Sequence, residues 1–148
     1  MKALEAALFR RAMERYREGP MRYMRDALEK PVLRDAVADL LHSTVLFLCQ
    51  PGHPRGCFSV QAALACGVDA EPIQKAMVEW RKAGEEALRK RFVMARRAGV
   101  LPKQTSPADF ARFIATVMAG LAVQAVNGAS RDEMKRTADL VLKAIGLA

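Results

Sequence analysis

The stretch CQPGHPRGC, residues 49–57, holds the side chains of this sequence that are best suited to chemistry. Cys49, His53 and Cys57 recur every four residues, and all three are zinc-ligand types. A structural zinc site needs four ligands, however, and three ligands at this spacing match no zinc-finger pattern. We therefore predict that the chain binds no metal. A thiol at a helix N-terminus beside a cation is unusually reactive, so Cys57, close to Arg55, is a candidate redox residue, whereas Cys49 fits a small buried hydrophobe.

No catalytic constellation accompanies these residues. The sequence contains no glycine-rich phosphate loop after a strand and no H-E-x-x-H motif. His42 stands next to Ser43, but adjacent side chains on a helix diverge, so the two do not form a catalytic pair. Acidic residues lie beside basic ones, as ordinary surface pairs do. We expect a protein that is not an enzyme and that uses no cofactor.

Composition and charge limit the partners. The chain of 148 residues carries a formal net charge of +8, which favours anionic partners, but its basic residues are dispersed and form no nucleic-acid-binding tail. The chain contains three cysteines. An odd number of cysteines argues against a disulfide framework and favours a reducing compartment. No apolar run reaches the roughly 18 residues of a membrane span, and the N-terminus lacks a signal-peptide cleavage site. We expect a cytoplasmic protein with no membrane partner.

Helical periodicity recurs along the chain, while the alternation typical of strands is nearly absent. Proline and glycine separate the periodic segments, as at Gly19-Pro20 and Pro51-Gly52. The predicted fold class is therefore all-α, a single helical bundle of about seven helices. Residues 45–49 are apolar on every side, so their helix is expected to run through the middle of the domain. The predicted helices cover residues 3–18, 20–29, 32–49, 57–66, 70–98, 106–127 and 130–145.

The last two predicted helices form an antiparallel hairpin, residues 106–146, with apolar residues on two sides. Met134, Ala138, Val141 and Ile145 recur at the spacing of a helix-packing seam. Leucines at positions 140, 142 and 147 face away from that seam and need a second partner. Burial against a second copy is the favoured solution, since twofold dimers are the commonest oligomers; alternatively, these leucines face the body of the same chain. The predicted dimer interface comprises Phe113, Val117, Leu121, Met134, Val141 and Ile145.

Polar and aromatic side chains interrupt the apolar ones in the central helices. His42, Gln61 and Trp80 are examples, and small residues such as Ala83 and Gly84 leave room beside large ones. A pocket with a few polar groups in apolar walls is how small organic ligands are held. The alternative is a filled core, in which His42 and Trp80 bond to the backbone.

Three segments, taken in their order along the chain, carry a resemblance to a known family. ALEAALFRRAMERY, residues 3–16, is similar to F-x-S-K-E-A-L-F-x-x-x-L-x-x-Y, although MKAL replaces the F-x-S-K portion. PRGCFSVQAALA, residues 54–65, is similar to R-G-C-L-x-x-N-A-A-L, with Gln61 in place of the common asparagine. Residues 96–145 resemble the family's penultimate and last helices. The chain thus resembles, over nearly all its length, the ligand-binding and dimerisation part of TetR/AcrR-family transcriptional regulators.

This resemblance implies a single effector-binding and dimerisation domain, residues 1–148. Residues 1–18 resemble the connector to the family's N-terminal helix-turn-helix; this sequence does not contain that unit, so we expect no operator reading by the chain as given. The implied partners are a second copy of the chain and a small apolar or aromatic effector, and DNA only through the missing unit. From helix position and chemistry, the residues predicted to line the effector pocket are His42, Phe47, Gln61, Met77, Trp80 and Met118.

Two alternatives stay open. Residues 49–57 connect the central helix to the next short one, and Cys57 is a secondary sensing candidate, because some members of the family respond to electrophiles through a cysteine. The alternative to an effector-binding module is a helical protein-interaction or heterodimerisation module that binds no small molecule.

Overall fold

The computed structural model describes residues 2–61 and 71–146, and within these ranges it contains helices and no strands. The all-α prediction is confirmed, and the predicted helix ends differ from the observed ones by no more than two residues where both are described. The exception is the predicted helix 57–66, of which residues 62–66 lie outside the described ranges. The helices are α1 (Lys2–Glu18), α2 (Arg22–Leu28), α3 (Leu33–Leu48), α4 (Phe58–Gln61), α5 (Glu71–Arg97), α6 (Pro107–Val126) and α7 (Arg131–Ala144).

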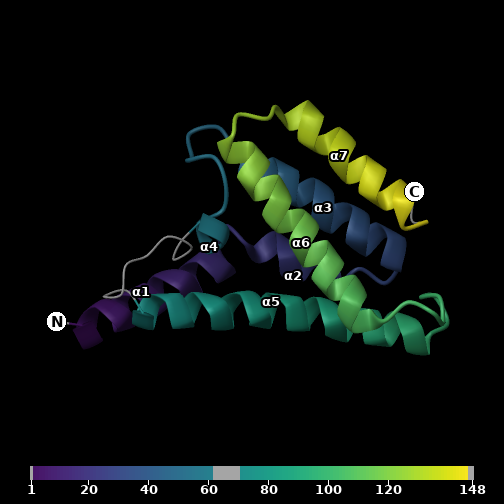
Figure 1. The fold of residues 1–148 in the computed structure, drawn as a ribbon, viewed down its shortest axis with the longest axis horizontal. Helices are drawn as coiled ribbons and strands as arrows, with labels where there is room; N and C mark the ends of the chain where they lie inside the picture. Colours follow the sequence, from purple (N-terminus) through teal and green to yellow (C-terminus); the bar gives the residue numbers. More distant parts are fainter. Residues whose placement is uncertain (1, 62–70, 147–148) are drawn as a thin grey trace.

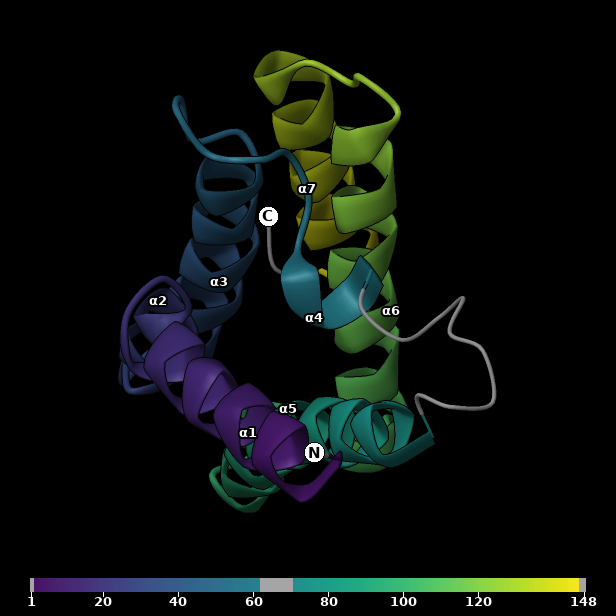
Figure 2. The same cartoon turned by 90° about the vertical axis from the view of Figure 1, so that its left-hand side faces the viewer.

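The helices are arranged in two crossing groups. In Figure 1, α1 and the long α5 run along the lower edge, and α6 rises from the end of α5 with α7 beyond it. Figure 2 shows α3, α6 and α7 running upward side by side, with α1 and α5 lying across their lower ends. The packing agrees with this view, since α3 contacts α2, α6 and α7, whereas α1 packs on α5.

The C-terminal hairpin has strong local signals at its helix ends. The Ser106 hydroxyl accepts the Asp109 backbone N–H, 3.3 Å away, at the start of α6. At the start of α7, Ser130 and Glu133 form a capping box: the Ser130 N–H donates to the Glu133 carboxylate, 2.8 Å away, and the Glu133 N–H donates to the Ser130 hydroxyl. These hydrogen bonds lower the pKa of Glu133 from its ordinary value. Local sequence therefore fixes where both helices begin.

The core is built around α3 and the crossing of α5 with α6. Phe92 of α5 packs against Phe110 of α6, with ring centroids 4.6 Å apart. The prediction that residues 45–49 are buried on every side is wrong at Leu46, whose side chain is 47% exposed. Leu46 lies about 180° around the helix from Val37, on the side that the packed helices do not cover. The buried stripe of α3 consists of Leu33, Ala36, Val37, Leu40, Leu41, Thr44, Val45 and Leu48.

Candidate functional site

The predicted effector-lining residues are spread over several interfaces. His42 of α3 lies against α7, where its Nε2 is 2.7 Å from Oδ1 of Asp139. This hydrogen bond lowers the pKa of the Asp139 carboxyl from its ordinary value, with a smaller contribution from Lys135. His42 is therefore engaged at the α3–α7 contact.

Met77 and Trp80 lie at the joint between α5 and α1. Met77 is fully buried and forms a small apolar cluster with Met13 of α1. The Arg17 guanidinium lies over the Trp80 ring, 5.7 Å from its centroid. These two predicted pocket residues fix α1 on the body of the protein.

The other three predicted residues have separate surroundings. Phe47 of α3 packs against Tyr23 of α2, with ring centroids 5.5 Å apart. Gln61 is exposed at the end of α4, and Met118 of α6 is partly buried against the main core. Phe47, Met77 and Trp80 lie around Tyr16 of α1, whereas His42 lies against α7. The effector-lining role of the six residues stays a prediction.

Five hydroxyl and thiol groups, which we call the hydroxyl cluster, lie where α1, α2, α3 and the start of α4 meet. Tyr16 Oη is 3.6 Å from Cys57 Sγ, and Cys57 Sγ is 2.9 Å from Ser59 Oγ. Thr44 Oγ1 is 3.3 Å from Tyr23 Oη. Both tyrosine rings also contact Phe47, which joins the two parts.

The hydroxyl cluster is enclosed and its phenols are neutral. Thr44, Cys57 and Ser59 are buried, and the two tyrosines are partly exposed. Burial raises the pKa of both Tyr16 and Tyr23 above the ordinary value, and the neighbouring Cys57 adds to the rise at Tyr16. The sequence offered one signal for this cluster, Thr44, the hydroxyl residue within the apolar stripe of α3.

The structure places Cys57 inside the protein. Its side chain is 6% exposed, directly before α4, with its sulfur in contact with two hydroxyl groups. Its sensing role therefore stays a prediction, because an electrophile would have to reach the interior of the protein to modify this thiol. Cys66, the third cysteine, lies outside the described residues.

An open hollow of about 440 Å³ lies between the α3–α4 loop and the start of α7. Arg55 ties this loop down, since its guanidinium donates to the Ala129 carbonyl and lies 3.4 Å from Cys49 Sγ. Within the described ranges, no group of three or more His, Cys, Asp or Glu side chains is arranged to hold a metal ion. The hollow is lined by Cys49, Gln50, Pro51, Gly52, His53, Arg55, Ser130 and Arg131.

The residues predicted for the dimer interface differ in how much surface they leave for a second copy, and their interface role stays a prediction. Leu121 and Met134 are 2% and 1% exposed within a single chain, so they have no surface left for a second copy. Leu142, expected to face away from the seam, is also buried. The physical reason is that α7 packs its Met134 side on α3 of the same chain. Val117, Val141 and Ile145 are partly buried against that core, and Phe113 alone of the predicted set is largely exposed.

Each helix of the hairpin carries a row of apolar and small residues outside the core, and we call the two rows together the outer stripe. Within each helix the members follow the 3-4 spacing of one face, and all of them are exposed. Phe113 and Val123 are 43% and 47% exposed, and Leu140 is 66% exposed. The outer stripe comprises Phe113, Thr116, Gly120 and Val123 of α6 with Thr137, Leu140 and Ala144 of α7.

The polar members of the outer stripe suit burial. The Thr116 hydroxyl donates to the Arg112 carbonyl, 2.8 Å away, and the Thr137 hydroxyl donates to the Glu133 carbonyl, 3.1 Å away. Both hydroxyl hydrogens are therefore donated within their own helix, so burial of these threonines leaves no hydrogen-bond donor unsatisfied. A Cβ added at Gly120 would meet no atom within 4 Å. The stripe thus combines apolar side chains, satisfied threonines and one position open to close approach.

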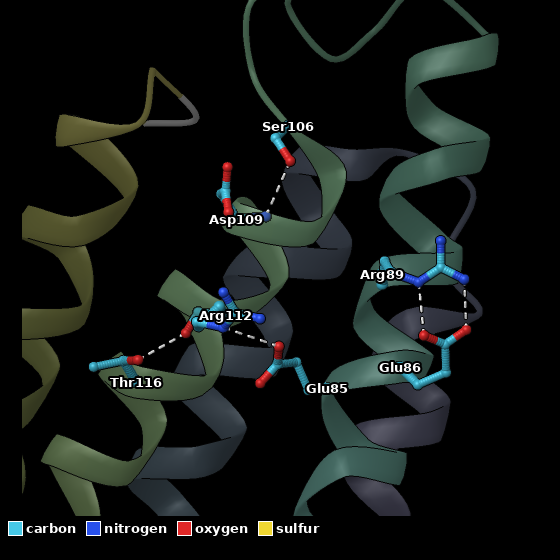
Figure 3. Close-up of polar contacts among 7 residues, drawn as sticks. All are labelled: Glu85, Glu86, Arg89, Ser106, Asp109, Arg112 and Thr116. Atoms are coloured by element: carbon cyan, nitrogen blue, oxygen red, sulfur yellow. Dashed lines mark hydrogen bonds and ion pairs between the residues drawn. The ribbon is translucent and has the colours of Figure 1, made fainter.

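One charged residue beside the outer stripe, Arg112, is turned toward α5. Figure 3 shows Arg112 of α6 reaching Glu85 of α5, with Nε 3.3 Å from Oε1, and the Thr116 hydroxyl on the Arg112 carbonyl. Figure 3 also shows Arg89 paired with Glu86 within α5, at 2.6 and 2.7 Å. That pairing lowers the pKa of Glu86. Exposed pairs of this kind add little stability, but the first directs the Arg112 charge away from the stripe.

Helix α6 has a high mean hydropathy because it is apolar on two sides. Within the described residues it is the one helix long and apolar enough to cross a membrane by length and composition. Only 33% of its most apolar 18-residue stretch is buried within the chain. Core helices outside membranes pass the same test, so this is weak evidence for a span. An inner side in the core and an outer stripe account for the composition.

Comparison with known proteins assigns this architecture to a class, the transcriptional regulators. Residues 34–141 match the model of the tetracyclin repressor-like, C-terminal domain. A cysteine-substituted variant of the TetR family transcriptional regulator CifR, complexed with 26-bp double-strand operator DNA, is 34% identical, with a TM-score of 0.86 over 93% of this chain and 72% of that chain. Another such variant in complex with 26-bp operator DNA is 32% identical, with a TM-score of 0.87 over 98% and 79%.

A protein from Rhodococcus sp. RHA1, assigned to the TetR transcriptional regulators, is 30% identical, with a TM-score of 0.70 over 83% of this chain and 65% of that chain. No curated protein sequence matches the chain. The family match and the CifR similarity together show that this chain belongs to the TetR family of transcriptional regulators. The predicted family is confirmed, and the chain is a regulator, not an enzyme.

Proposed function

We propose that this chain is the effector-binding and dimerisation module of a TetR-family regulator. In this proposal a small organic molecule bound within the bundle controls a DNA-binding unit that lies outside the chain. The observation that carries the proposal is the outer stripe, an apolar face on a helical hairpin that the protomer itself leaves uncovered. Two copies pair their outer stripes through a twofold axis, so that each α6–α7 hairpin supplies half of a four-helix seam.

The connection to DNA runs through α1. Its exposed side carries Leu4 and Leu8, which are 75% and 69% exposed and lie one helical turn apart. Two neighbouring leucines on a solvent face suit contact with a preceding unit. CifR, whose chains this chain covers to 72% and 79%, is complexed with operator DNA. We infer that operator binding in the whole protein uses a helix-turn-helix that precedes α1.

The contacts that attach α1 to the rest of the protein couple effector binding to DNA binding. Met13 packs on α5, and Tyr16 touches both Cys57 and the Phe58 backbone N–H, which lies 3.4 Å from its hydroxyl oxygen. An effector that binds one arrangement of these contacts more tightly than another shifts the equilibrium between two positions of α1. The size of that shift is set by the difference in affinity.

The dimer is tested with Leu140→Lys, which introduces a charge into the centre of the outer stripe. Sedimentation equilibrium of the parent chain at micromolar concentration is expected to give a dimer, and the variant a monomer of unchanged helicity. Met94→Lys is the matched control, because Met94 is 63% exposed on α5 and lies outside the stripe. A parent chain that sediments as a monomer overturns the dimer.

Effector binding is tested by thermal shift with a panel of aromatic, fatty and cationic compounds. A ligand at 100 times its Kd adds about 2.7 kcal/mol of stability to the folded state. A shift by any class of compound supports the effector module. A dimer that responds to none of them favours instead a heterodimerisation module without a small ligand.

A further inference from the structure

The open hollow between the α3–α4 loop and the start of α7 has a positively charged lining. Arg55 and Arg131 are among its lining residues, and none of these residues is an aspartate or a glutamate. Elsewhere in the described chain an arginine faces a carboxylate from another helix, as Arg112 faces Glu85. Two guanidinium groups at one hollow attract an anion, because an anion placed there reduces their mutual repulsion.

The loop side of the hollow is held in place by hydrogen bonds. The Arg55 guanidinium donates through Nη2 to the Ala129 carbonyl, and its Nε and Nη1 hydrogens have no acceptor among the described residues. The His53 N–H donates to the Gln50 carbonyl, 3.3 Å away, which closes a turn around Pro51. A guanidinium that is already oriented loses less side-chain entropy when a ligand binds. Arg55 therefore presents a fixed set of donors at the hollow.

The α7 side contributes a cation that no carboxylate of the chain contacts. The Arg131 guanidinium makes no hydrogen bond or ion pair with the described residues. The Glu133 carboxylate, from the same turn, accepts the Ser130 N–H at 2.8 Å and the Ser130 hydroxyl at 2.7 Å, and it is not part of the lining. The side chains of His53 and Gln50 likewise have no partner among the described residues. The hollow thus offers a guanidinium, an imidazole and an amide for a ligand.

The hollow has the size for a small molecule and lies away from the side of the protein that leads to DNA. Its volume of about 440 Å³ is within the range of small-ligand pockets. Figure 1 shows α1 along the lower edge, whereas the α3–α4 loop and the start of α7 lie at the upper side. An operator bound by a unit that precedes α1 lies on the lower side. The anion that suits the hollow is therefore a small molecule.

Phosphate is the anionic group that matches this lining. A guanidinium donates two parallel N–H groups to an oxyanion, and a phosphate ester has three oxygens that can accept from different directions. It also carries about two negative charges at neutral pH, against one on a carboxylate. Two guanidinium groups thus balance the charge of one phosphate ester.

We propose that this hollow binds a small molecule that carries a phosphate group, with Arg55 and Arg131 as the counter-charges of that group. The site is separate from the predicted effector-lining residues, and the inference does not depend on the proposed function. Arg55 belongs to the loop that follows α3, and Arg131 belongs to α7. The bound phosphate therefore connects the central helix to the C-terminal hairpin.

The test compares three probes that share a three-carbon skeleton: glycerol 3-phosphate, glycerate and glycerol. The intact chain, labelled with ¹⁵N, is titrated with each probe at constant ionic strength, and backbone amide signals are followed by NMR. Glycerol 3-phosphate is expected to shift the signals of the lining residues and to bind most tightly. Glycerate is expected to bind more weakly, and glycerol is expected to leave the signals unchanged.

Arg131→Gln is the decisive variant, because the Arg131 guanidinium has no bond within the described chain that its removal would break. The Kd for glycerol 3-phosphate is expected to rise roughly fivefold, the size of one exposed, charge-assisted contact. Arg97→Gln is the matched control. It removes the same charge from an exposed position in the last turn of α5, outside the hollow, and its Kd is expected to equal that of the parent.

Three results overturn the inference. The first is that glycerol 3-phosphate shifts no signals, or shifts signals all over the protein and not at the lining residues. The second is an equal rise in Kd for Arg131→Gln and Arg97→Gln, which reduces the effect to net charge. The third is binding of glycerate as tight as that of glycerol 3-phosphate, which removes the preference for phosphate. None of these results bears on the dimer or on the effector, which the sedimentation and thermal-shift experiments test separately.

Discussion

At the scale of single residues, the hydrogen bond between His42 and Asp139 is a packing contact with a measurable pH signature. It lowers the pKa of the Asp139 carboxyl in the folded chain. A lowered folded pKa means that the contact stabilises the protein above the ordinary aspartate value of about 3.9 and that this contribution is lost as the pH falls through the folded value.

Asp139→Asn is therefore expected to lower the melting temperature at neutral pH, with the difference from the parent shrinking as the pH falls below the ordinary aspartate range. Melting temperatures of both proteins across an acid titration measure this. Glu14→Gln removes one negative charge from α1 and leaves the His42 contact in place, so it serves as the control. A difference that is constant with pH contradicts the assignment.

Thiol accessibility is a second property that belongs to single residues. Cys49 is partly exposed beside the open hollow, whereas Cys57 is 6% exposed. Iodoacetamide is therefore expected to modify Cys49 before Cys57 in the folded chain, and both at similar rates in urea. Peptide mass spectrometry over time distinguishes the two sites. Equal labelling in the folded chain would show that reagents reach Cys57 readily, and would favour its predicted sensing role.

At the scale of elements, the α3–α4 loop depends on Gly56. Its φ of +98° is unfavourable for any residue with a Cβ, and an added Cβ would collide with the Gln61 and Val126 side chains. Gly52, in the same loop, has a φ of +79° but open space around it. The two glycines separate backbone strain from crowding.

Gly56→Ala is expected to lower the free energy of unfolding by about 2–3 kcal/mol, and Gly52→Ala by about 1 kcal/mol. The additional loss of unfolding free energy at Gly56 measures the steric crowding between the loop, α4 and α6. Urea denaturation of both variants measures it. Equal losses at the two positions would show that the loop relaxes away from α4 and α6.

At the scale of the whole molecule, Gly120 makes a prediction in which folding and association move in opposite directions. Leucine has a higher helix propensity than glycine, and the protomer has free space at this position. Gly120→Leu is therefore expected to stabilise the monomer by about 0.5–1 kcal/mol and to weaken the dimer, because it blocks the close approach of two outer stripes.

Sedimentation equilibrium gives the dimer affinity, and thermal melting at concentrations that favour the monomer gives the stability. Gly84→Leu is the matched control, since Gly84 lies on α5 and a Cβ added there also meets no atom within 4 Å. It is expected to stabilise the chain without changing the dimer. An unchanged or tighter dimer in Gly120→Leu rules out pairing through the outer stripe at this position.

The sequence alone determined the helices and their ends, because the signals for them are local. Ser106 with Pro107, and Ser130 with Glu133, specify the starts of α6 and α7 through contacts within four residues. Helical periodicity and three short segments likewise sufficed to predict the fold class and the family. None of these inferences required a contact between distant parts of the chain.

Only the tertiary structure decided which side of each helix is buried and which groups meet. Helix α7 has one apolar side with Met134 and another with Leu140, and only its packing on α3 selects the first for the core. The hydroxyl cluster joins Tyr16 to Cys57 across 41 positions of sequence. A helical pattern specifies directions around one axis, whereas the rotation of that axis against its neighbours follows from the free energy of packing the whole core.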